Sequence, residues 1–283
     1  MLPRRDTGRV RIDLHTHSSV SDGTGTPAQV MREAAAAGLD VVALADHDST
    51  DGWDEAAAEA DRLGLGFVPA IEVSARDRWV SIHMLAYWPR TDDAGLAEIL
   101  ALTREARLGR ARSMVEKIAI DYELAWEDVV EQAGGAATVG RPHIADALVA
   151  RGHFRVRDEV FLEVLHNSSP YYVPHYAPDV HDAVRAIRAA GGVPVFAHPG
   201  AHARGRVVPD SVIASLAAAG LAGLEVDHRD HDANQIERLG ELAERHGLIR
   251  TGSSDYHGTG KLNRLGENLT SEAAFEALVA QRG

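Results

Sequence analysis

The sequence predicts an α/β protein, folded either as a closed barrel or as a doubly wound sheet. Short apolar runs alternate with helical patterns, and seven such runs occur along the 283 residues. The alternation is interrupted once, by consecutive helical patterns over roughly 95–175. Strands that alternate with helices form parallel sheets, because each helix returns the chain to the start of the next strand.

The strands are predicted from short runs rich in apolar residues. These runs are Val10–Leu14, Asp40–Ala45, Gly66–Val73, Trp79–Tyr87, Val193–Ala197, Gly223–Val226 and Leu248–Gly252. Thr26 followed by Pro27 is typical of a helix start, and Gly38 of its end. A second helix is predicted over Trp53–Leu63, and alanine-rich helices near 209–219 and 231–246.

Helical patterns follow one another in the middle of the chain without a strand between them. They cover Leu96–Ile118, Trp126–Ala133, Pro142–Arg151 and Asp158–His166, and a loop rich in tyrosine and proline follows at 171–176. We interpret this segment as a helical insertion between the fourth and fifth strands. The expected domains are therefore a barrel of residues 1–94 and 176–283 and an insertion of residues 95–175.

The composition excludes several classes of protein. With 29 basic and 42 acidic residues the net charge is −13, which argues against binding to duplex nucleic acid but leaves room for a small anion in a local basic pocket. The absence of cysteine excludes disulfides, thiolate-bound metals and thiol nucleophiles. With no signal-like N-terminus and no apolar stretch of about 18 residues, we expect a cytoplasmic protein that does not bind membranes. The sequence carries no clear sign of the oligomeric state.

Side chains typical of metal ligands accompany six of the seven predicted strands. They are His15, His17, Asp22, His47, Glu72, His83, His198, Asp255 and His257. Because the carboxyl ends of the strands in a parallel barrel open on one face, we expect these side chains to converge there. Imidazole and carboxylate together suit manganese, zinc or iron.

Nine such side chains are too many for one ion. The expectation is two or three divalent ions that share a bridging carboxylate, Glu72 being the best candidate. Their excess positive charge would attract phosphate, and a metal-bound hydroxide would be the natural nucleophile. A lone histidine such as His83 could instead be a core residue. The remaining histidines, at 153, 166, 175, 181, 202, 228, 231 and 246, are expected to be surface or local structural residues.

The motifs around these residues resemble one known family. They read Asp13-Leu14-His15-Thr16-His17, Ser21-Asp22-Gly23, Ala45-Asp46-His47-Asp48, Glu72, His83, Ala197-His198-Pro199 and Ser254-Asp255-Tyr256-His257. In this order they resemble the polymerase and histidinol phosphatase (PHP) family of metal-dependent phosphoesterases. The resemblance implies a distorted (β/α)7 barrel with a trinuclear centre, for which manganese is the expected metal and zinc or iron the alternatives.

The resemblance also implies a distribution of the ligands. His15, His17, Glu72 and Asp255 would hold one ion, and Asp22, His47 and His257 a second. Glu72, His83 and His198 would hold the third. His198, Asp22, His47 and His143 are the expected catalytic residues.

Within the family, the helical insertion and the motif Arg141-Pro142-His143 resemble one branch. That branch removes the 3′-phosphate of nucleotide 3′,5′-bisphosphates such as adenosine 3′,5′-bisphosphate, or trims short RNA from a 5′-phosphorylated end. Arg104, Arg107 and Arg110 recur at every third residue and would form a stripe on one helix face. With Arg141 and His143 they are the predicted substrate-binding residues, since guanidinium groups grip phosphate oxygens.

Other interpretations remain open at this stage. The arginine stripe could be a solvated helix face, and Tyr171, Tyr172 and Tyr176 could either stack on a base or pack the insertion against the barrel. An exoribonuclease acting on short 5′-phosphorylated RNA is the main alternative function. A histidinol-phosphate phosphatase is less favoured, and a non-catalytic metal-binding domain least of all.

Overall fold

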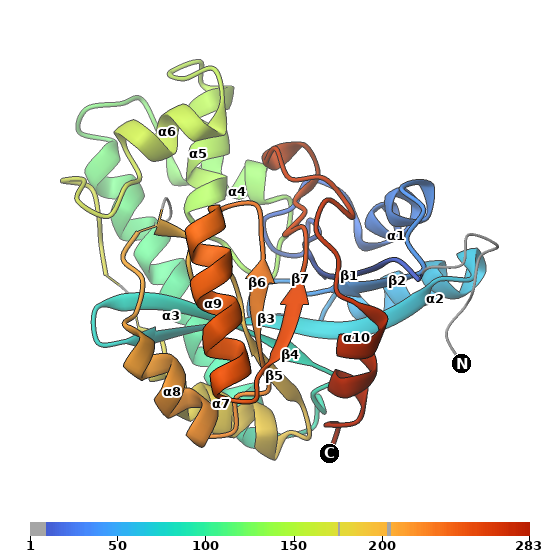
Figure 1. The fold of residues 1–283 in the computed structure, drawn as a ribbon. Helices are drawn as coiled ribbons and strands as arrows, with labels where there is room; N and C mark the ends of the chain where they lie inside the picture. The colour runs from blue at the N-terminus through green and yellow to red at the C-terminus, as the bar shows by residue number, and fades with distance from the viewer. Residues whose placement is uncertain (1–9, 175, 203–204) are drawn as a thin grey trace.

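The seven predicted strands form one nearly closed barrel. The computed structural model describes residues 10–174, 176–202 and 205–283. The strands are β1 (Ile12–Thr16), β2 (Val41–Leu44), β3 (Gly66–Asp77), β4 (Val80–Tyr87), β5 (Val193–Phe196), β6 (Gly223–Asp227) and β7 (Ile249–Gly252), and they are paired in chain order. Backbone bridges from Thr16 to Tyr256 and from Ile12 to Thr270 link β1 to the chain that follows β7. The predicted distorted seven-stranded barrel is therefore confirmed (Figure 1).

One strand runs against the others, which corrects the expectation of a parallel sheet. β4 is antiparallel to both β3 and β5, whereas the other neighbouring strands are parallel. Only Arg78 and Trp79 separate β3 from β4, and so short a connection allows a hairpin but no helical crossover. β3 also extends to Asp77, beyond the predicted end at Val73, while Trp79 lies at the turn with 86% of its surface exposed.

Helices cover the outside of the barrel. They are α1 (Pro27–Ala36), α2 (Trp53–Leu63), α7 (Val180–Ala189), α8 (Asp210–Ala218), α9 (Ala233–Arg245) and α10 (Glu272–Val279). α7 and α10 were not predicted. α7 nevertheless shows ordinary signals, an Asp179 cap and a helical spacing of buried Val180, Ala183, Val184 and Ile187. None of the helices in the described ranges is long and apolar enough to cross a membrane.

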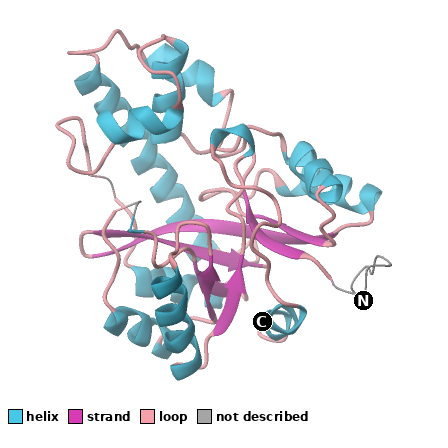
Figure 2. Ribbon diagram, turned by 45° about the horizontal axis from the view of Figure 1, so that its top comes forward, coloured by secondary structure: helices cyan, strands magenta, loops and turns pink. Residues whose placement is uncertain are grey.

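The insertion consists of α3 (Ala94–Ile118), α4 (Trp126–Ala133), α5 (Arg141–Ala150) and α6 (Arg157–Glu163). Its apolar core, which includes Met114, Ile118, Ile144 and Leu148, is separate from the barrel core. Figure 2 shows the shorter helices of the insertion grouped at one end of the sheet, while α3 continues from them behind the strands. The first turns of α3 behave differently, because Leu96 and Leu100 pack with the barrel. The domain boundaries at residues 95 and 175 stay predictions.

Alternation along the strands decides which side chains point into the barrel. In β3, Val68 and Ala70 join the inner apolar cluster, while Ile71 and Val73 pack in a second cluster with α7, α8 and α9. Since successive strand residues face opposite sides, Glu72 shares the inner face with Ala70. In β4 the inner residues are Leu85 and Tyr87. His83 has the same parity and therefore also points inward.

Candidate metal centre

All nine side chains proposed as metal ligands lie together at one end of the barrel. Their ligand atoms fall into overlapping groups, each within 4.8 Å. The groups are His15, His17, Glu72 and Asp255; His17, Asp22, His47 and His257; and His47, Glu72 and His83. His198 completes the cluster, with its Nε2 3.0 Å from Oε1 of Glu72.

Glu72 lies at the middle of this cluster. Its Oε2 is 3.3 Å from Nε2 of His15, 3.1 Å from Nε2 of His17 and 3.1 Å from Nδ1 of His47. Its Oε1 is 2.7 Å from Nδ1 of His83. Both carboxylate oxygens thus face imidazoles, which is the arrangement expected of a bridging ligand. The reversal of β4 also explains why His83 lies within its strand, because the start of β4 is level with the ends of the parallel strands.

The backbone is strained at three points around the cluster. Asp48, His198 and Asp255 have φ values of 53°, 34° and 54°, in the left-handed region that residues other than glycine rarely adopt. Each follows the carboxyl end of a parallel strand, β2, β5 or β7. Asp adopts this region more readily than most residues, whereas at His198 the conformation costs of order 1–3 kcal/mol. Strain of this kind concentrates at functional sites.

The electrostatics keep the carboxylates of Glu72 and Asp22 ionised. Burial raises the pKa of Glu72, but His47, His83 and His15 outweigh this effect and bring the pKa well below its usual range. Burial also raises the pKa of Asp22, and here His257 and His47 lower it well below the usual value. Burial and the nearby Lys261 lower the pKa of His257 to about 4. These are the forms of Glu72, Asp22 and His257 that bind a metal. For His15 and His17, burial lowers the pKa but the surrounding carboxylates outweigh it, and they raise the pKa of His15 well above its usual value and that of His17 to about 9, so these two rings lose a proton when an ion binds.

The donor set fits divalent ions. Nδ1 of His47, Nδ1 of His83 and Nε2 of His257 are buried and have no hydrogen-bond partner among the described residues, although carboxylate oxygens lie close by. Buried polar atoms are normally hydrogen-bonded, so such a group of exceptions fits atoms that coordinate metal ions. Imidazoles and carboxylates are the ligands that manganese, iron and zinc share.

Several residues near the cluster were not among the predicted site residues. Glu225 accepts hydrogen bonds within the cluster and is fully buried. Lys261 donates to Oδ2 of Asp255 at 3.2 Å. Glu225 lies near the carboxyl end of β6 inside an apolar run. The rule that ligand-type side chains accompany the strands could therefore have found it.

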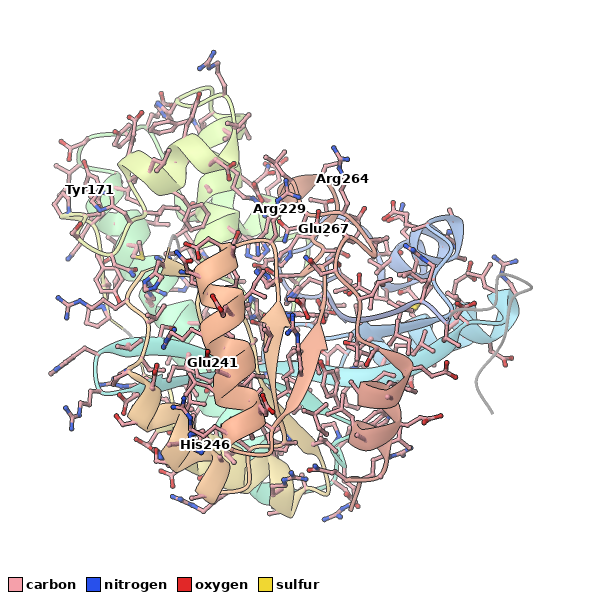
Figure 3. All side chains as sticks on the ribbon, viewed as in Figure 1. Tyr171, Arg229, Glu241, His246, Arg264 and Glu267 are labelled. Carbon is pink, nitrogen blue, oxygen red and sulfur yellow. The ribbon has the colours of Figure 1, made fainter. Side chains whose placement is uncertain are left out.

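Two of the histidines expected to be surface or local structural residues are buried. His228 and His231 are buried, with exposed fractions of 2% and 7%. Nε2 of His228 lies 3.7 Å from Oδ2 of Asp255, and its ring packs against His198. His231 accepts a hydrogen bond from the backbone of Gly200, which is a local structural role. His175 lies outside the described residues, and His246 follows α9 at the end opposite the cluster (Figure 3).

Arg104 and Arg107 reach the barrel from α3. Nη1 of Arg104 donates to the backbone oxygen of Asp48, and Nε of Arg107 lies 3.1 Å from Oδ2 of the same residue. Arg107 also donates to the hydroxyl of Ser74, whose own N–H and O–H bond Asp48. This cluster of Arg104, Arg107, Asp48 and Ser74, which we call the Asp48 latch, holds α3 against the site.

Arg110 and Arg141 differ from the other two arginines because they have no carboxylate partner among the described residues. Arg110 donates to the backbone oxygen of Val173 and stacks over Tyr172, while Arg141 donates to Leu165 and Asn167. Burial and the charge of Arg141 lower the pKa of Arg110 to about 9. Neighbouring guanidinium groups that have no carboxylate partner in the described part of the chain are suited to bind an anion.

His143 and Arg157 join the insertion to the Asp22 loop. His143 is buried and accepts a hydrogen bond from the N–H of Gly140 through Nδ1, which leaves the ring proton on Nε2. Burial lowers its pKa, and Asp22 is among its charged neighbours. Arg157 binds both oxygens of Asp146 and donates to the backbone oxygen of Asp22. No pattern in the sequence indicates this role for Arg157.

The three tyrosines separate into different environments. Tyr171 donates to Asp121 and contacts Tyr122, so it packs within the insertion, at whose outer edge it lies in Figure 3. Tyr172 lies beneath Arg110, while Tyr176 has 48% of its surface exposed.

Comparison with known proteins identifies relatives over nearly the whole chain. The PHP domain matches residues 13–131. The chain is 36% identical to the 3′,5′-nucleoside bisphosphate phosphatase of Chromobacterium violaceum, with 89% of each chain covered. It is 32% identical to the phosphoribosyl 1,2-cyclic phosphate 1,2-diphosphodiesterase of Eggerthella lenta, over 87% of this chain and 94% of the relative. It is also 29% identical to the 5′-3′ exoribonuclease Rnm of Salmonella typhimurium, over 95% and 92%.

Solved structures are also similar to this chain over nearly its whole length. A Bifidobacterium adolescentis protein described as a metal-dependent phosphoesterase has a TM-score of 0.94 and 41% identity, covering 100% of this chain and 98% of its own. A Chromobacterium violaceum protein described as an amidohydrolase with bound sulfate and no metal has a TM-score of 0.87 and 34% identity, over 96% and 97%. The chain therefore belongs to the PHP-domain family and is a metal-dependent phosphoesterase, a hydrolase of phosphate esters.

Proposed function

We propose that this chain hydrolyses the 3′-phosphate of nucleoside 3′,5′-bisphosphates such as adenosine 3′,5′-bisphosphate. The observation that carries the proposal is the pair Arg110 and Arg141, which lack carboxylate partners in the described part of the chain. Both belong to the insertion, which contacts the chain beside the metal centre through Arg107 and Arg157. A substrate with two phosphates could then use both positive sites, one phosphate at the metal centre and the other at the two arginines. The relative with 36% identity is named for this reaction.

The nine clustered side chains would hold two or three divalent ions, with manganese the expected metal. Bound ions would neutralise charge on the phosphoryl oxygens and supply a nucleophile at neutral pH. His198, Asp22 and His47, which were predicted to be catalytic, would act as ligands. His143, with its proton on Nε2, would orient the Asp22 loop and face the substrate beside it.

The arginines contribute by positioning the substrate. A 5′-phosphate held by Arg110 and Arg141 fixes the far end of the nucleotide, so the 3′-ester is presented to the metal centre in one orientation. Positioning of this kind lowers the activation barrier without new chemistry. Arg104 and Arg107 would act indirectly, because the Asp48 latch already holds them.

The second candidate is 5′-3′ exoribonuclease activity on short 5′-phosphorylated RNA. Relatives with 29% identity carry this name, and a 5′-terminal phosphate would use the same two arginines. The net charge of −13 gives little attraction for a long polyanion, so we expect contact with only a few nucleotides at one end.

We also propose that the protein acts in the cytoplasm.

Side-by-side hydrolysis assays test the proposal. Adenosine 3′,5′-bisphosphate, adenosine 3′-monophosphate, histidinol phosphate, a 5′-phosphorylated RNA and a ribose 1,2-cyclic phosphate are compared with manganese present. We expect the bisphosphate to be preferred over the 3′-monophosphate by at least tenfold in kcat/KM. Equal rates on both nucleotides would reject the role of the second phosphate, and a clear preference for the cyclic ester or the RNA would replace the proposed substrate.

Two variants of α3 test whether Arg110 binds the second phosphate. Arg110→Gln should raise KM for the bisphosphate by about 10–100-fold, in line with the 1.5–3 kcal/mol of a charged hydrogen bond, and leave the 3′-monophosphate unaffected. Arg112→Gln is the matched control, since Arg112 stacks on Trp126 instead. Identical behaviour of the two variants would contradict the assignment of Arg110.

A further inference from the structure

Glu225 is a buried carboxylate inside the barrel that is not one of the nine predicted ligands. Its neighbours in β6, Leu224 and Val226, belong to the outer cluster with α9, so Glu225 points to the opposite, inner side. Its surface is completely buried. Burial of a carboxylate costs free energy unless its oxygens are hydrogen-bonded. Both oxygens of Glu225 make a hydrogen bond.

The first oxygen fixes the orientation of His15. Oε1 of Glu225 lies 3.0 Å from Nδ1 of His15. A carboxylate only accepts, so the ring proton of a neutral His15 resides on Nδ1. Nε2 then presents its lone pair to the space shared with His17, Glu72 and Asp255. Because the carboxylate selects this tautomer, it makes His15 competent as a ligand.

The second oxygen holds the backbone of His198. The N–H of His198 donates to Oε2 of Glu225 at 2.7 Å. His198 has the strained φ of 34°, and in this conformation its Nε2 lies 3.0 Å from Glu72. A left-handed conformation persists only where surrounding contacts impose it, and this hydrogen bond is one such contact.

We propose that Glu225 is the positioning residue of the metal centre, which aligns His15 from β1 and His198 from β5 through one carboxylate. The inference rests on the proposed metal centre. Glu225 acts through these two residues and is not a ligand, since both of its oxygens are engaged on the sides of His15 and His198 that face away from the ligand atoms. Such partners of metal-bound histidines typically change metal affinity by 10–100-fold.

Replacement by glutamine separates positioning from simple space filling. In Glu225→Gln, the amide oxygen can serve only one partner. If it faces His15, the NH2 group opposes the N–H of His198. If it faces His198, the NH2 group donates to Nδ1 of His15, which moves the ring proton to Nε2 and blocks the ligand position. Either arrangement should weaken metal binding although the volume is unchanged.

Manganese titration followed by electron paramagnetic resonance measures the effect. We expect Glu225→Gln to raise the dissociation constant by 10–100-fold, and to change the visible absorption spectrum of the cobalt-substituted protein. The control is Asp227→Asn, which makes the same chemical change two residues along β6, where Asp227 pairs with Arg250 at the surface. It should bind manganese like the parent. Equal affinities and identical cobalt spectra for both variants would overturn the proposal.

A measurement on the unmodified chain covers the case in which Glu225→Gln does not fold. Proton–nitrogen correlation spectra of the zinc-loaded protein report which imidazole nitrogen carries the proton. We expect His15 to be protonated at Nδ1 and metal-bound at Nε2, and a proton on Nε2 would overturn the role of Glu225. If the parent binds neither manganese nor zinc, the metal centre itself fails, a result distinct from a centre that forms without help from Glu225.

Discussion

One carboxyl group near the metal centre, that of Asp13, lies in an environment that disfavours its charged form. Asp13 is fully buried, and burial raises its pKa from 3.8 to about 6. Backbone N–H groups of Ser254 and Gly266 donate to its two oxygens and tie the chain after β7 to β1. The charged form therefore connects distant segments, but it costs free energy because it is removed from water.

This cost should appear in the pH dependence of stability. Between pH 3.8 and about 6 the folded state holds a proton on Asp13 that the unfolded state has released, so stability falls as pH rises through this window. Asn cannot ionise. The difference in the free energy of unfolding between Asp13→Asn and the parent should therefore shift by about 3 kcal/mol in favour of the variant as the pH rises from 3.8 to about 6. Urea unfolding of both metal-free proteins at pH 4 and pH 7 checks this, and a pH-independent difference would contradict it.

At the scale of elements, the attachment of α3 to the barrel depends on the Asp48 latch. Asp48 is completely buried, follows β2 and receives contacts from both Arg104 and Arg107 of α3. Its φ of 53° is tolerated by Asn as well as Asp. The charge of Asp48 can therefore be removed without changing the backbone conformation.

Asp48→Asn should loosen the insertion. Removing one partner of a buried ion pair leaves Arg107 without its counter-ion, and we expect a loss of about 3 kcal/mol in the free energy of unfolding. Amide hydrogen exchange should become faster in α3. Asp61→Asn, at an exposed position of α2, is the control and should change neither quantity. Unchanged exchange in α3 would show that the latch does not hold the helix.

How far the sequence predicts an element depends on whether its signal is local. The strand-and-helix order and the nine clustered side chains follow from patterns within a few residues of one another, and the structure brings the nine side chains together. The direction of β4 was not predicted, because periodicity is the same in both directions and only the two-residue turn at Arg78 and Trp79 distinguishes them. Glu225 and His228 lie in or directly after β6, where the same local rule could have found them, whereas their partners His15 and Asp255 are distant in sequence and could be identified only from the structure.

At the scale of the whole molecule, the site joins every strand of the barrel. Glu72 and His83 come from β3 and β4, and the other ligands lie in or directly after β1, β2, β5 and β7. Glu225 adds β6. An ion bound at this end would therefore act as a cross-link between segments that are distant in sequence, and its binding free energy would contribute to folding.

Removal of metal should lower the thermal stability of the whole chain. At a free metal concentration of 100 times Kd, binding to the folded state adds about 2.7 kcal/mol. For a chain of 283 residues this corresponds to about 5 °C in Tm. Differential scanning fluorimetry with a chelator, and then with manganese restored, measures the change. A Tm that does not respond to either addition would argue against a structural contribution from the ions.

The reversed direction of β4 gives the length of α3 a role in placing the insertion relative to the metal centre. Because β4 is reversed, the chain leaves this strand at the end of the barrel that is away from the site. α3 then returns toward the site over 25 residues, a length of about 37 Å, and runs behind the sheet in Figure 1. One residue added after Leu100 would turn the rest of α3 by about 100° and separate Arg104 and Arg107 from Asp48. Seven added residues would restore the direction but raise the insertion by about 10 Å. If Arg110 and Arg141 hold the second phosphate as proposed, both changes should weaken binding of the bisphosphate in a titration and spare metal binding, because no predicted metal ligand belongs to α3. The number of residues in α3 would then set the distance between the two phosphate sites.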